Sequence, residues 1–246
     1  MLYKYYSCET YNLEALANGY LWFSNPKKLN DPFDCNFDAY IESEHIDTLK
    51  DEYKQKLISQ LNKLGICSFS QEQDNQHFWS LYAKNYSGFC LVFDKNIIDS
   101  RLGRLGIILG NTEYQTEVFD VITYFSQQQE KGADFKTAME RSLRTFAFSK
   151  NKKVWETENE VRALLAGIFI ENPKLESAKV IFEGKGYKVH FKDFNALKQI
   201  ILGHNMSSVN KELILNIVKH NYPDIKISKV ELDYKNWELK IVDLIK

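Results

Sequence analysis

The stretch that indicates the fold and the site reads Trp155-Glu156-Thr157-Glu158-Asn159-Glu160-Val161-Arg162, just after a basic run at Lys150, Lys152 and Lys153. Read with the two-residue period of a strand, it places three glutamates and Arg162 on one face. Same-side neighbours on a strand lie about 6.5–7 Å apart. Carboxylates that close repel one another unless a cation lies among them. The pattern therefore predicts a strand that carries an acidic functional site.

The same residues also fit a helix. Glu158 and Arg162 would then form an i,i+4 ion pair on a solvated face, worth about 0.2–0.5 kcal/mol. Short charged stretches do not decide between the two periods, so both interpretations stay open at this point.

Composition sets the class of protein. The chain has 246 residues, of which 44% are hydrophobic, 14% aromatic and 26% charged, with a formal net charge of -1. We expect one soluble domain over 1–246, with no overall field that attracts nucleic acid. No leader and no apolar run of membrane-spanning length is apparent, so a cytoplasmic protein without membrane contact is expected. Four scattered cysteines and five histidines without metal spacing predict neither disulfides nor a metal cage.

Strands and helices mix without a steady βαβ rhythm, which predicts an α+β fold: a mixed, largely antiparallel sheet with flanking helices. The expected strands are 2–6, 20–24, 66–70, 89–93, 106–114, 160–165, 178–182, 187–191, 198–202, 225–232 and 237–242. The expected helices are 12–18, 43–64, 77–84, 134–148 and 208–220. The segment 101–106, which contains glycine, is expected to be a turn.

A second candidate element is Asn30-Asp31-Pro32-Phe33-Asp34. Asn and Asp before Pro favour a turn whose side chains bond nearby amides. The segment is therefore either a rigid turn or a loop that directs Asn30 or Asp31 into a cleft.

A third element is Cys67-Ser68-Phe69-Ser70, followed by Phe78-Trp79-Ser80-Leu81-Tyr82. Ser68 and Ser70 offer hydroxyl groups, and Trp79 and Tyr82 offer flat walls that hold planar cationic rings. The alternative is that these aromatic residues pack in the core, as most do.

In order and content, these segments resemble the bacterial and phage family known as domain of unknown function 2971. The resemblance extends over nearly the whole chain and is carried by the Asn-Asp-Pro-Phe and Trp-x-x-Glu-x-Glu-x-Arg elements. Phe78 stands where that family usually has Met. The family context implies a role in bacterial stress response or phage defence.

The chain also resembles, more distantly, ADP-ribosyltransferases of the arginine–serine–glutamate type. These carry a basic residue on the first strand, a Ser-x-Ser strand and a late Glu-x-Glu. The corresponding residues here are Lys4, in place of Arg, then Ser68 and Ser70, then Glu158 and Glu160. The resemblance implies an ADP-ribosyltransferase-like fold and NAD as a substrate.

The resemblance also implies a role for each candidate. Glu160 would hold the nicotinamide ribose 2′-hydroxyl, and Glu158 would orient or deprotonate the acceptor. The NAD-binding candidates are Lys4, Asn30, Asp31, Ser68, Ser70, Trp79, Tyr82 and Arg162. The products would be an ADP-ribosylated macromolecule or hydrolysed NAD.

Two other functions stay open on sequence grounds. Asp31, Glu158 and Glu160 are hard oxygen ligands that suit a Mg²⁺-dependent nuclease, with Lys152 or Lys153 beside the phosphate. Alternatively, the chain is a non-enzymatic module that binds a nucleotide or a protein. The interpretation as a binding module gains support if the stretch 158–162 is a solvated helix far from any pocket.

Overall fold

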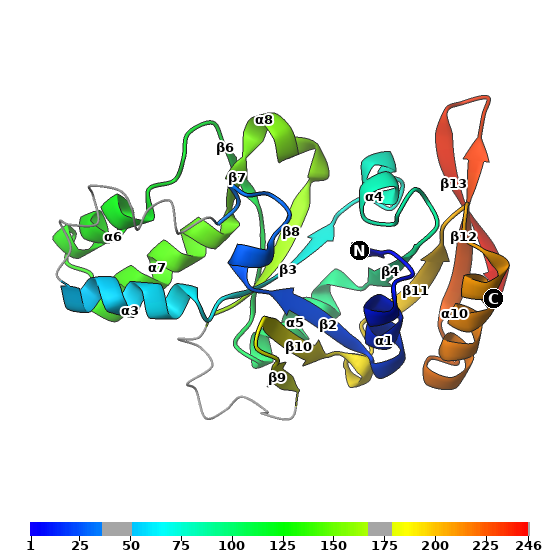
Figure 1. Ribbon diagram of the computed structural model, residues 1–246, viewed down its shortest axis with the longest axis horizontal. Helices are drawn as coiled ribbons and strands as arrows, with labels where there is room; N and C mark the ends of the chain where they lie inside the picture. The colour runs from blue at the N-terminus through cyan, green and yellow to red at the C-terminus, as the bar shows by residue number, and fades with distance from the viewer. Residues whose placement is uncertain (36–50, 167–178, 246) are drawn as a thin grey trace.

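The computed structural model describes residues 1–35, 51–166 and 179–245 (Figure 1). Its strands are β1 Leu2–Tyr6, β2 Tyr20–Ser24, β3 Gly65–Ser70, β4 Phe89–Phe93, β5 Ile108–Asn111, β6 Glu113–Gln115, β7 Ser149–Asn151, β8 Glu160–Leu165, β9 Val180–Phe182, β10 Gly186–His190, β11 Leu197–Leu202, β12 Lys226–Asp233 and β13 Glu238–Ile245. Its helices are α1 Thr10–Asn18, α3 Asp51–Leu61, α4 Gln76–Leu81, α5 Lys95–Arg104, α6 Val121–Glu130, α7 Phe135–Phe148, α8 Lys152–Trp155 and α10 Ser208–Asn221, with 3₁₀ turns η1 Pro26–Lys28, η3 Glu156–Glu158 and η4 Lys192–Phe194.

The main sheet is long and largely antiparallel. Its strands follow the order β13-β12-β11-β4-β1-β3-β2-β10-β9, and β8 joins it by pairing with β3 and β5. Within this sheet the β11–β12 pair is parallel, and β6 and β7 form a separate parallel pair. The predicted α+β class with a mixed, mainly antiparallel sheet is confirmed.

The sheet forks at β3. Strand β8 pairs with β3 along its whole length, from Gly65 to Ser70. On the opposite edge, β1 pairs only with Ser70 and β2 pairs only with Ile66. The two strands therefore diverge from opposite ends of β3, and the middle of this edge has no strand partner. A cleft lies at this fork.

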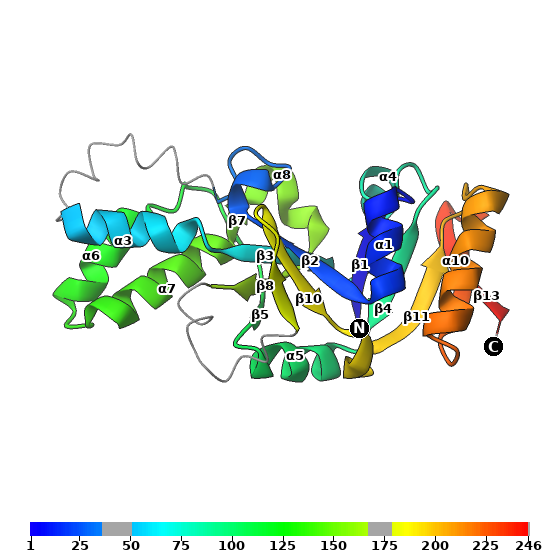
Figure 2. The same ribbon diagram turned by 60° about the horizontal axis from the view of Figure 1, so that its bottom comes forward.

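Helices cover the sheet on both faces because its central strands are apolar on both sides. In β4, Phe89, Leu91 and Phe93 pack into the core that also contains residues of α1, α5 and α10. The alternate residues Cys90 and Val92 pack on the other face with α4. A second core joins α3, α6 and α7 at one end of the molecule (Figure 2).

Several element predictions need correction. Segment 106–114 is two short strands separated at Thr112, and 101–106 belongs mostly to helix α5, which ends before Gly106 at φ 71°. The predicted helix 43–64 is described only from Asp51 to Leu61, and its first part lies outside the described residues. Gly65, expected to end that helix, is instead the first residue of β3.

Candidate functional site

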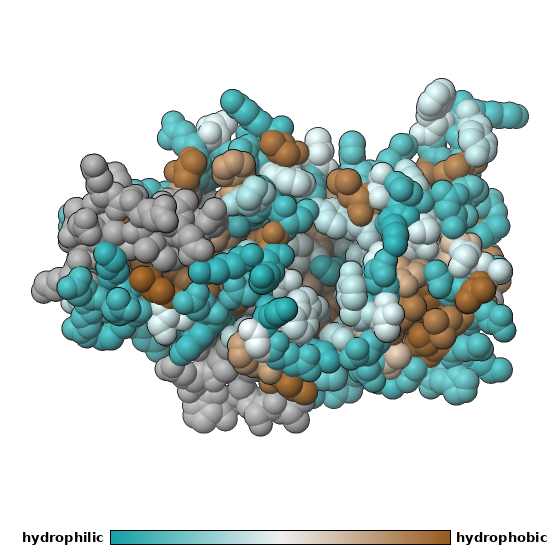
Figure 3. All heavy atoms as spheres, in the orientation of Figure 1, coloured by the Kyte–Doolittle hydropathy of each residue, from teal (hydrophilic) through white to brown (hydrophobic). Residues whose placement is uncertain are grey.

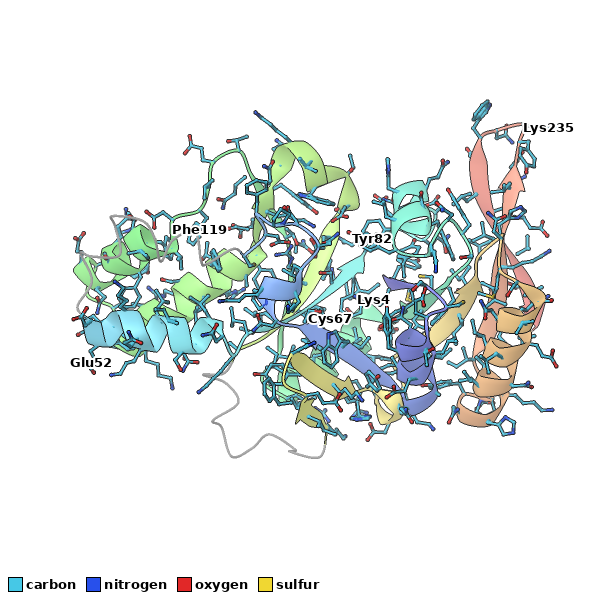
Figure 4. All side chains as sticks on the ribbon, viewed as in Figure 1. Lys4, Glu52, Cys67, Tyr82, Phe119 and Lys235 are labelled. Carbon is cyan, nitrogen blue, oxygen red and sulfur yellow. The ribbon has the colours of Figure 1, made fainter. Side chains whose placement is uncertain are left out.

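A cleft of about 1070 Å³ opens at the fork between β1 and β2. Strands β1, β2 and β3 supply Lys4, Trp22 and Ser68, and Tyr82 follows directly after helix α4. Lys4 and Tyr82 come from distant parts of the chain and face the same central region (Figure 4). Seen from the side of Figure 3, the surface between α8 and α4 is hollowed and carries mostly pale and teal atoms.

Five charged side chains form a buried cluster at one end of this cleft, which we call the charge cluster. Its members are Asp34, Lys150, Glu158, Glu160 and Arg162, each at most 6% exposed. All of them except Arg162 line the cleft. Three carboxylates face two cations, so the cluster is net negative by one charge when every group is ionised.

Arg162 joins two of the carboxylates. Its Nε donates to Glu160 Oε1 at 2.9 Å, and its two terminal nitrogens donate to Asp34 at 2.9 and 2.5 Å. One terminal nitrogen also reaches Glu160 Oε2 at 3.1 Å, and the other reaches the Ala147 carbonyl at 2.7 Å. All five N–H groups of the guanidinium are thus used, in the paired geometry that suits arginine and carboxylate. Arg162 does not line the cleft, so it holds the Glu160 carboxylate from the side away from the cleft.

Lys150 joins the two glutamates. Its Nζ donates to Glu158 Oε2 at 2.7 Å and to Glu160 Oε2 at 3.0 Å, and it lies 4.4 Å from the centre of the Trp155 ring. Asp34 Oδ2 is 4.0 Å away. Lys150 is therefore the cation that the close carboxylates require.

These contacts keep Glu160 and Lys150 ionised. Burial raises the pKa of Glu160, but Arg162 and Lys150 outweigh it and lower that pKa to about 2. Burial lowers the pKa of Lys150, but the carboxylates of Glu160 and Glu158 outweigh it and raise that pKa above its usual value. Opposite charges at hydrogen-bond distance dominate over burial in both cases.

The backbone that presents the glutamates is not the single strand predicted from the sequence. Glu156 to Glu158 form the 3₁₀ turn η3, Asn159 adopts φ 47°, and β8 begins only at Glu160. Asn tolerates this left-handed conformation better than most residues. The turn leaves Glu156 exposed, while Glu158 and Glu160 reach the same lysine. The alternative of a solvated helix is wrong as well, because Glu160 and Arg162 are buried.

The Asn-Asp-Pro-Phe-Asp segment is both a rigid turn and a part of the cleft. Asp31 is buried, accepts a bond from the Phe33 amide at 2.9 Å, and does not line the cleft. Asn30 does line it and donates to the Tyr82 hydroxyl at 3.2 Å. Asp34 enters the charge cluster. Of the two candidates from this segment, the structure thus places Asn30 at the cleft and Asp31 in the turn.

The two aromatic candidates, Trp79 in α4 and Tyr82 at its C-terminal cap, have different roles. Trp79 is fully buried, donates from its ring N–H to the Gln73 carbonyl at 3.0 Å, and packs edge-on against Tyr5. Trp79 is therefore a core residue and does not line the cleft, contrary to its prediction as a wall. Tyr82 lines the cleft, and its hydroxyl donates to Glu158 Oε1 at 2.7 Å. Burial and then the Glu158 charge raise the pKa of Tyr82, so its hydroxyl stays protonated.

The serine candidates also separate. Ser68 lines the cleft, and its carbonyl accepts from Lys4 Nζ at 2.7 Å. Lys4 thus occupies the edge of β3 that no strand covers. Ser70 is fully buried, and its Oγ accepts from the Glu72 amide at 3.1 Å. Ser70 stabilises the turn after β3 and does not reach the cleft.

Two members of the charge cluster were not among the predicted site residues. Asp34 is the last residue of the Asn-Asp-Pro-Phe-Asp segment, and Lys150 begins the basic run before the acidic stretch. The available signal was charge balance, since three close carboxylates need cations. Trp22, which also lines the cleft, gave no signal in the sequence.

The arrangement does not favour the nuclease interpretation. Asp31 lies outside the cleft, and Glu158 and Glu160 are bonded to Lys150 and Arg162, whose positive charges oppose a divalent cation at the same oxygens. Among residues 1–35, 51–166 and 179–245, no group of three or more potential metal ligands is found. No helix in the described ranges is long and apolar enough to cross a membrane.

A family model described as "Protein of unknown function (DUF2971)" matches residues 78–163. This confirms the predicted family resemblance over a segment that runs from α4 into β8. The segment contains Tyr82 and every member of the charge cluster except Asp34. Neither a curated protein nor a solved structure matches the chain.

Proposed function

We propose that the protein is an NAD-dependent, ADP-ribosyltransferase-like enzyme that transfers ADP-ribose to a macromolecule or hydrolyses NAD. The supporting observation is that Lys4, Ser68, Glu158 and Glu160 line one cleft. These residues are far apart in the chain and follow the order that the resemblance implies. In this proposal the enzyme acts in bacterial stress response or phage defence.

The reaction breaks the bond between C1′ of the nicotinamide ribose and the ring nitrogen. The electron pair leaves with neutral nicotinamide, and the ribose carbon becomes oxocarbenium-like. Oxygen of water, or a nucleophilic atom of the acceptor, then bonds C1′ and loses a proton. The enzyme must therefore stabilise positive charge at the sugar and accept one proton.

The charge cluster suits both tasks. Glu160, ionised by its contacts with Arg162 and Lys150, accepts a bond from the ribose 2′-hydroxyl and stabilises the positive charge. Glu158 lies on the α4 side, bonded to Tyr82 and Lys150, and takes the proton of the nucleophile. Lys150 and Arg162 position the two carboxylates.

The remaining residues hold the substrate. Lys4 is a cation that lines the cleft, and its hydrogen bond to the Ser68 carbonyl leaves ammonium donors for a substrate phosphate. Tyr82, with the neighbouring Phe78 ring at 4.9 Å, provides the aromatic wall for the nicotinamide ring.

The test is incubation of the purified protein with NAD and measurement of nicotinamide release. We expect release by the wild type and a loss of about 100-fold or more in Glu160→Gln, because charge stabilisation at the transition state is removed. The matched control is Glu156→Gln, which changes an exposed glutamate of the preceding turn η3 and is expected to keep wild-type activity. Absence of nicotinamide release and of labelled acceptor with wild-type protein refutes the proposal.

A further inference from the structure

The end of the cleft away from the charge cluster is built by β2 and β10. On β2 the alternate residues Tyr20, Trp22 and Ser24 line the cleft, whereas Leu21 and Phe23 are buried on the other face. Trp22 pairs in register with Lys188 of β10, and Ser24 pairs with Gly186. Trp22 is therefore held on regular sheet structure rather than on a loop.

Gly186 makes room for the Trp22 indole. A Cβ atom at position 186 would lie 2.7 Å from Trp22 Cζ2 and 2.9 Å from Cε2, and 2.4 Å from the Phe23 carbonyl oxygen. Only glycine lets the ring rest against the β10 backbone at this point. One side of the indole is thus supported by the sheet, while the residue also contributes to the cleft wall.

The indole has no partner within the described parts of the chain. Among residues 1–35, 51–166 and 179–245, no aromatic ring stacks on it, no cation lies over it and no acceptor bonds its N–H. The N–H does not belong to the buried side-chain groups that lack a hydrogen-bond partner. This differs from Trp79, whose N–H is bonded, and from Trp155, which lies under Lys150. A supported, partly exposed indole in a cleft is a platform for stacking a planar ring.

Two lysines without carboxylate partners also line the cleft. Lys28 of η1 and Lys185 line the cleft and are exposed, and neither forms an ion pair with any described residue. Lys185 directly precedes Gly186, and its carbonyl accepts from the Asn25 amide at 3.3 Å. Lys188, by contrast, is bonded to Glu14 and Glu183. Lys185 is therefore an unpaired cation next to the Trp22 platform, and Lys28 is a second one in the same cleft.

We propose that this end of the cleft binds a nucleoside monophosphate, with its base stacked on Trp22 and its phosphate beside Lys185 and Lys28. Its assignment to the adenylate half of a dinucleotide rests on the proposed function. The subsite itself does not need the reaction, because a stacking platform and free ammonium groups bind a nucleotide without turnover.

The experiment is calorimetric titration of the protein with AMP, adenosine and ribose 5-phosphate. We expect AMP to bind more tightly than either fragment. Trp22→Leu should weaken AMP about tenfold or more, the amount typical of a lost base–aromatic stack, and Trp22→Phe should retain most of the affinity. Lys185→Ala should weaken AMP and leave adenosine unchanged.

Two matched controls change exposed residues of the β12–β13 hairpin, away from the cleft. Trp237→Leu and Lys235→Ala are expected to bind AMP as the wild type does, because Trp237 is 88% exposed and Lys235 lies at the hairpin tip (Figure 4). If Trp22→Leu does not fold, Lys185→Ala still carries the test, because it should weaken AMP and leave adenosine unchanged.

Equal affinity for AMP and ribose 5-phosphate overturns the inference, and so does wild-type AMP affinity in folded Trp22→Leu. AMP binding without nicotinamide release supports the subsite and counts against the proposed reaction. Nicotinamide release together with unchanged AMP affinity in both the Trp22→Leu and Lys185→Ala variants supports the proposed reaction and refutes the subsite.

Discussion

The two ends of the cleft satisfy their polar groups in different ways. At the charge cluster, Arg162 and Lys150 are bonded to protein carboxylates, and every member is buried. At the β2–β10 end, the Trp22 indole N–H and the Lys185 ammonium form no hydrogen bond or ion pair with the described residues, and Lys185 is exposed. One end is complete without a ligand and the other is not. In the two proposals made above, the first end is the reaction centre and the second is the surface that recognises the nucleotide.

The largest difference in stability between the two ends is expected when the arginine of the charge cluster is removed. Arg162→Met should lower the free energy of unfolding by about 3–5 kcal/mol, because it leaves Asp34 and Glu160 as buried carboxylates without their main partner. Urea denaturation measures the change. Arg104→Met, on the exposed end of α5, should change stability by less than about 1 kcal/mol. Similar losses in both variants would mean that the cluster is not a special source of stability.

The pH dependence of the free energy of unfolding tests the ionised state of Glu160 in the charge cluster. The pKa of Glu160 falls from 4.5 to about 2 on folding. Its contribution, about 3 kcal/mol, is therefore fully present above pH 4.5 and is lost as the pH falls toward 2. Denaturation curves across this window should show a steeper loss for the wild type than for Glu160→Gln, in which the group cannot titrate. Parallel losses would contradict the lowered pKa.

The smallest effect is expected at the exposed ion pairs of the other end. Lys188 Nζ lies 3.2 Å from Glu14 and 3.0 Å from Glu183, and both glutamates are exposed. Lys188→Met should therefore cost less than about 1 kcal/mol, and the cost should shrink in 1 M NaCl. A double-mutant cycle with Glu14→Gln measures the pair itself. A loss as large as that of Arg162→Met would remove the distinction between the two ends.

Much of the fold was predictable because its signals are local. The spacing of apolar residues and the capping residues predict strands such as β2 and β4 and helices such as α7. Asp134, for example, caps α7 by accepting from the Thr137 amide. Helix α5 was missed because its buried stripe is narrow, with only Ile98 and Leu102 buried, and because Gly103 lies within it. Helix α6 was missed although Asp120 caps it, since its second half is rich in glutamine.

The site was predictable only in part, because its partners meet through tertiary structure. The acidic stretch identified Glu158, Glu160 and Arg162, but the left-handed Asn159 that separates turn from strand leaves no periodic trace. Asp34 meets Arg162 across 128 positions of sequence. No pattern shows that Ser68 turns to the cleft while Ser70 supports a turn, because residues two apart on a strand share one face.

The fork at β3 has a consequence for spectroscopy. In an antiparallel strand, the N–H and C=O of one residue point to the same edge. The Ser68 carbonyl faces the fork, since Lys4 bonds it, so the Ser68 amide faces the fork too, where neither β1 nor β2 pairs with it. Hydrogen–deuterium exchange at the Ser68 amide therefore reports whether the cleft is occupied. The backbone amides of Cys67 and Phe69 point toward β8 instead and serve as internal references within the same strand.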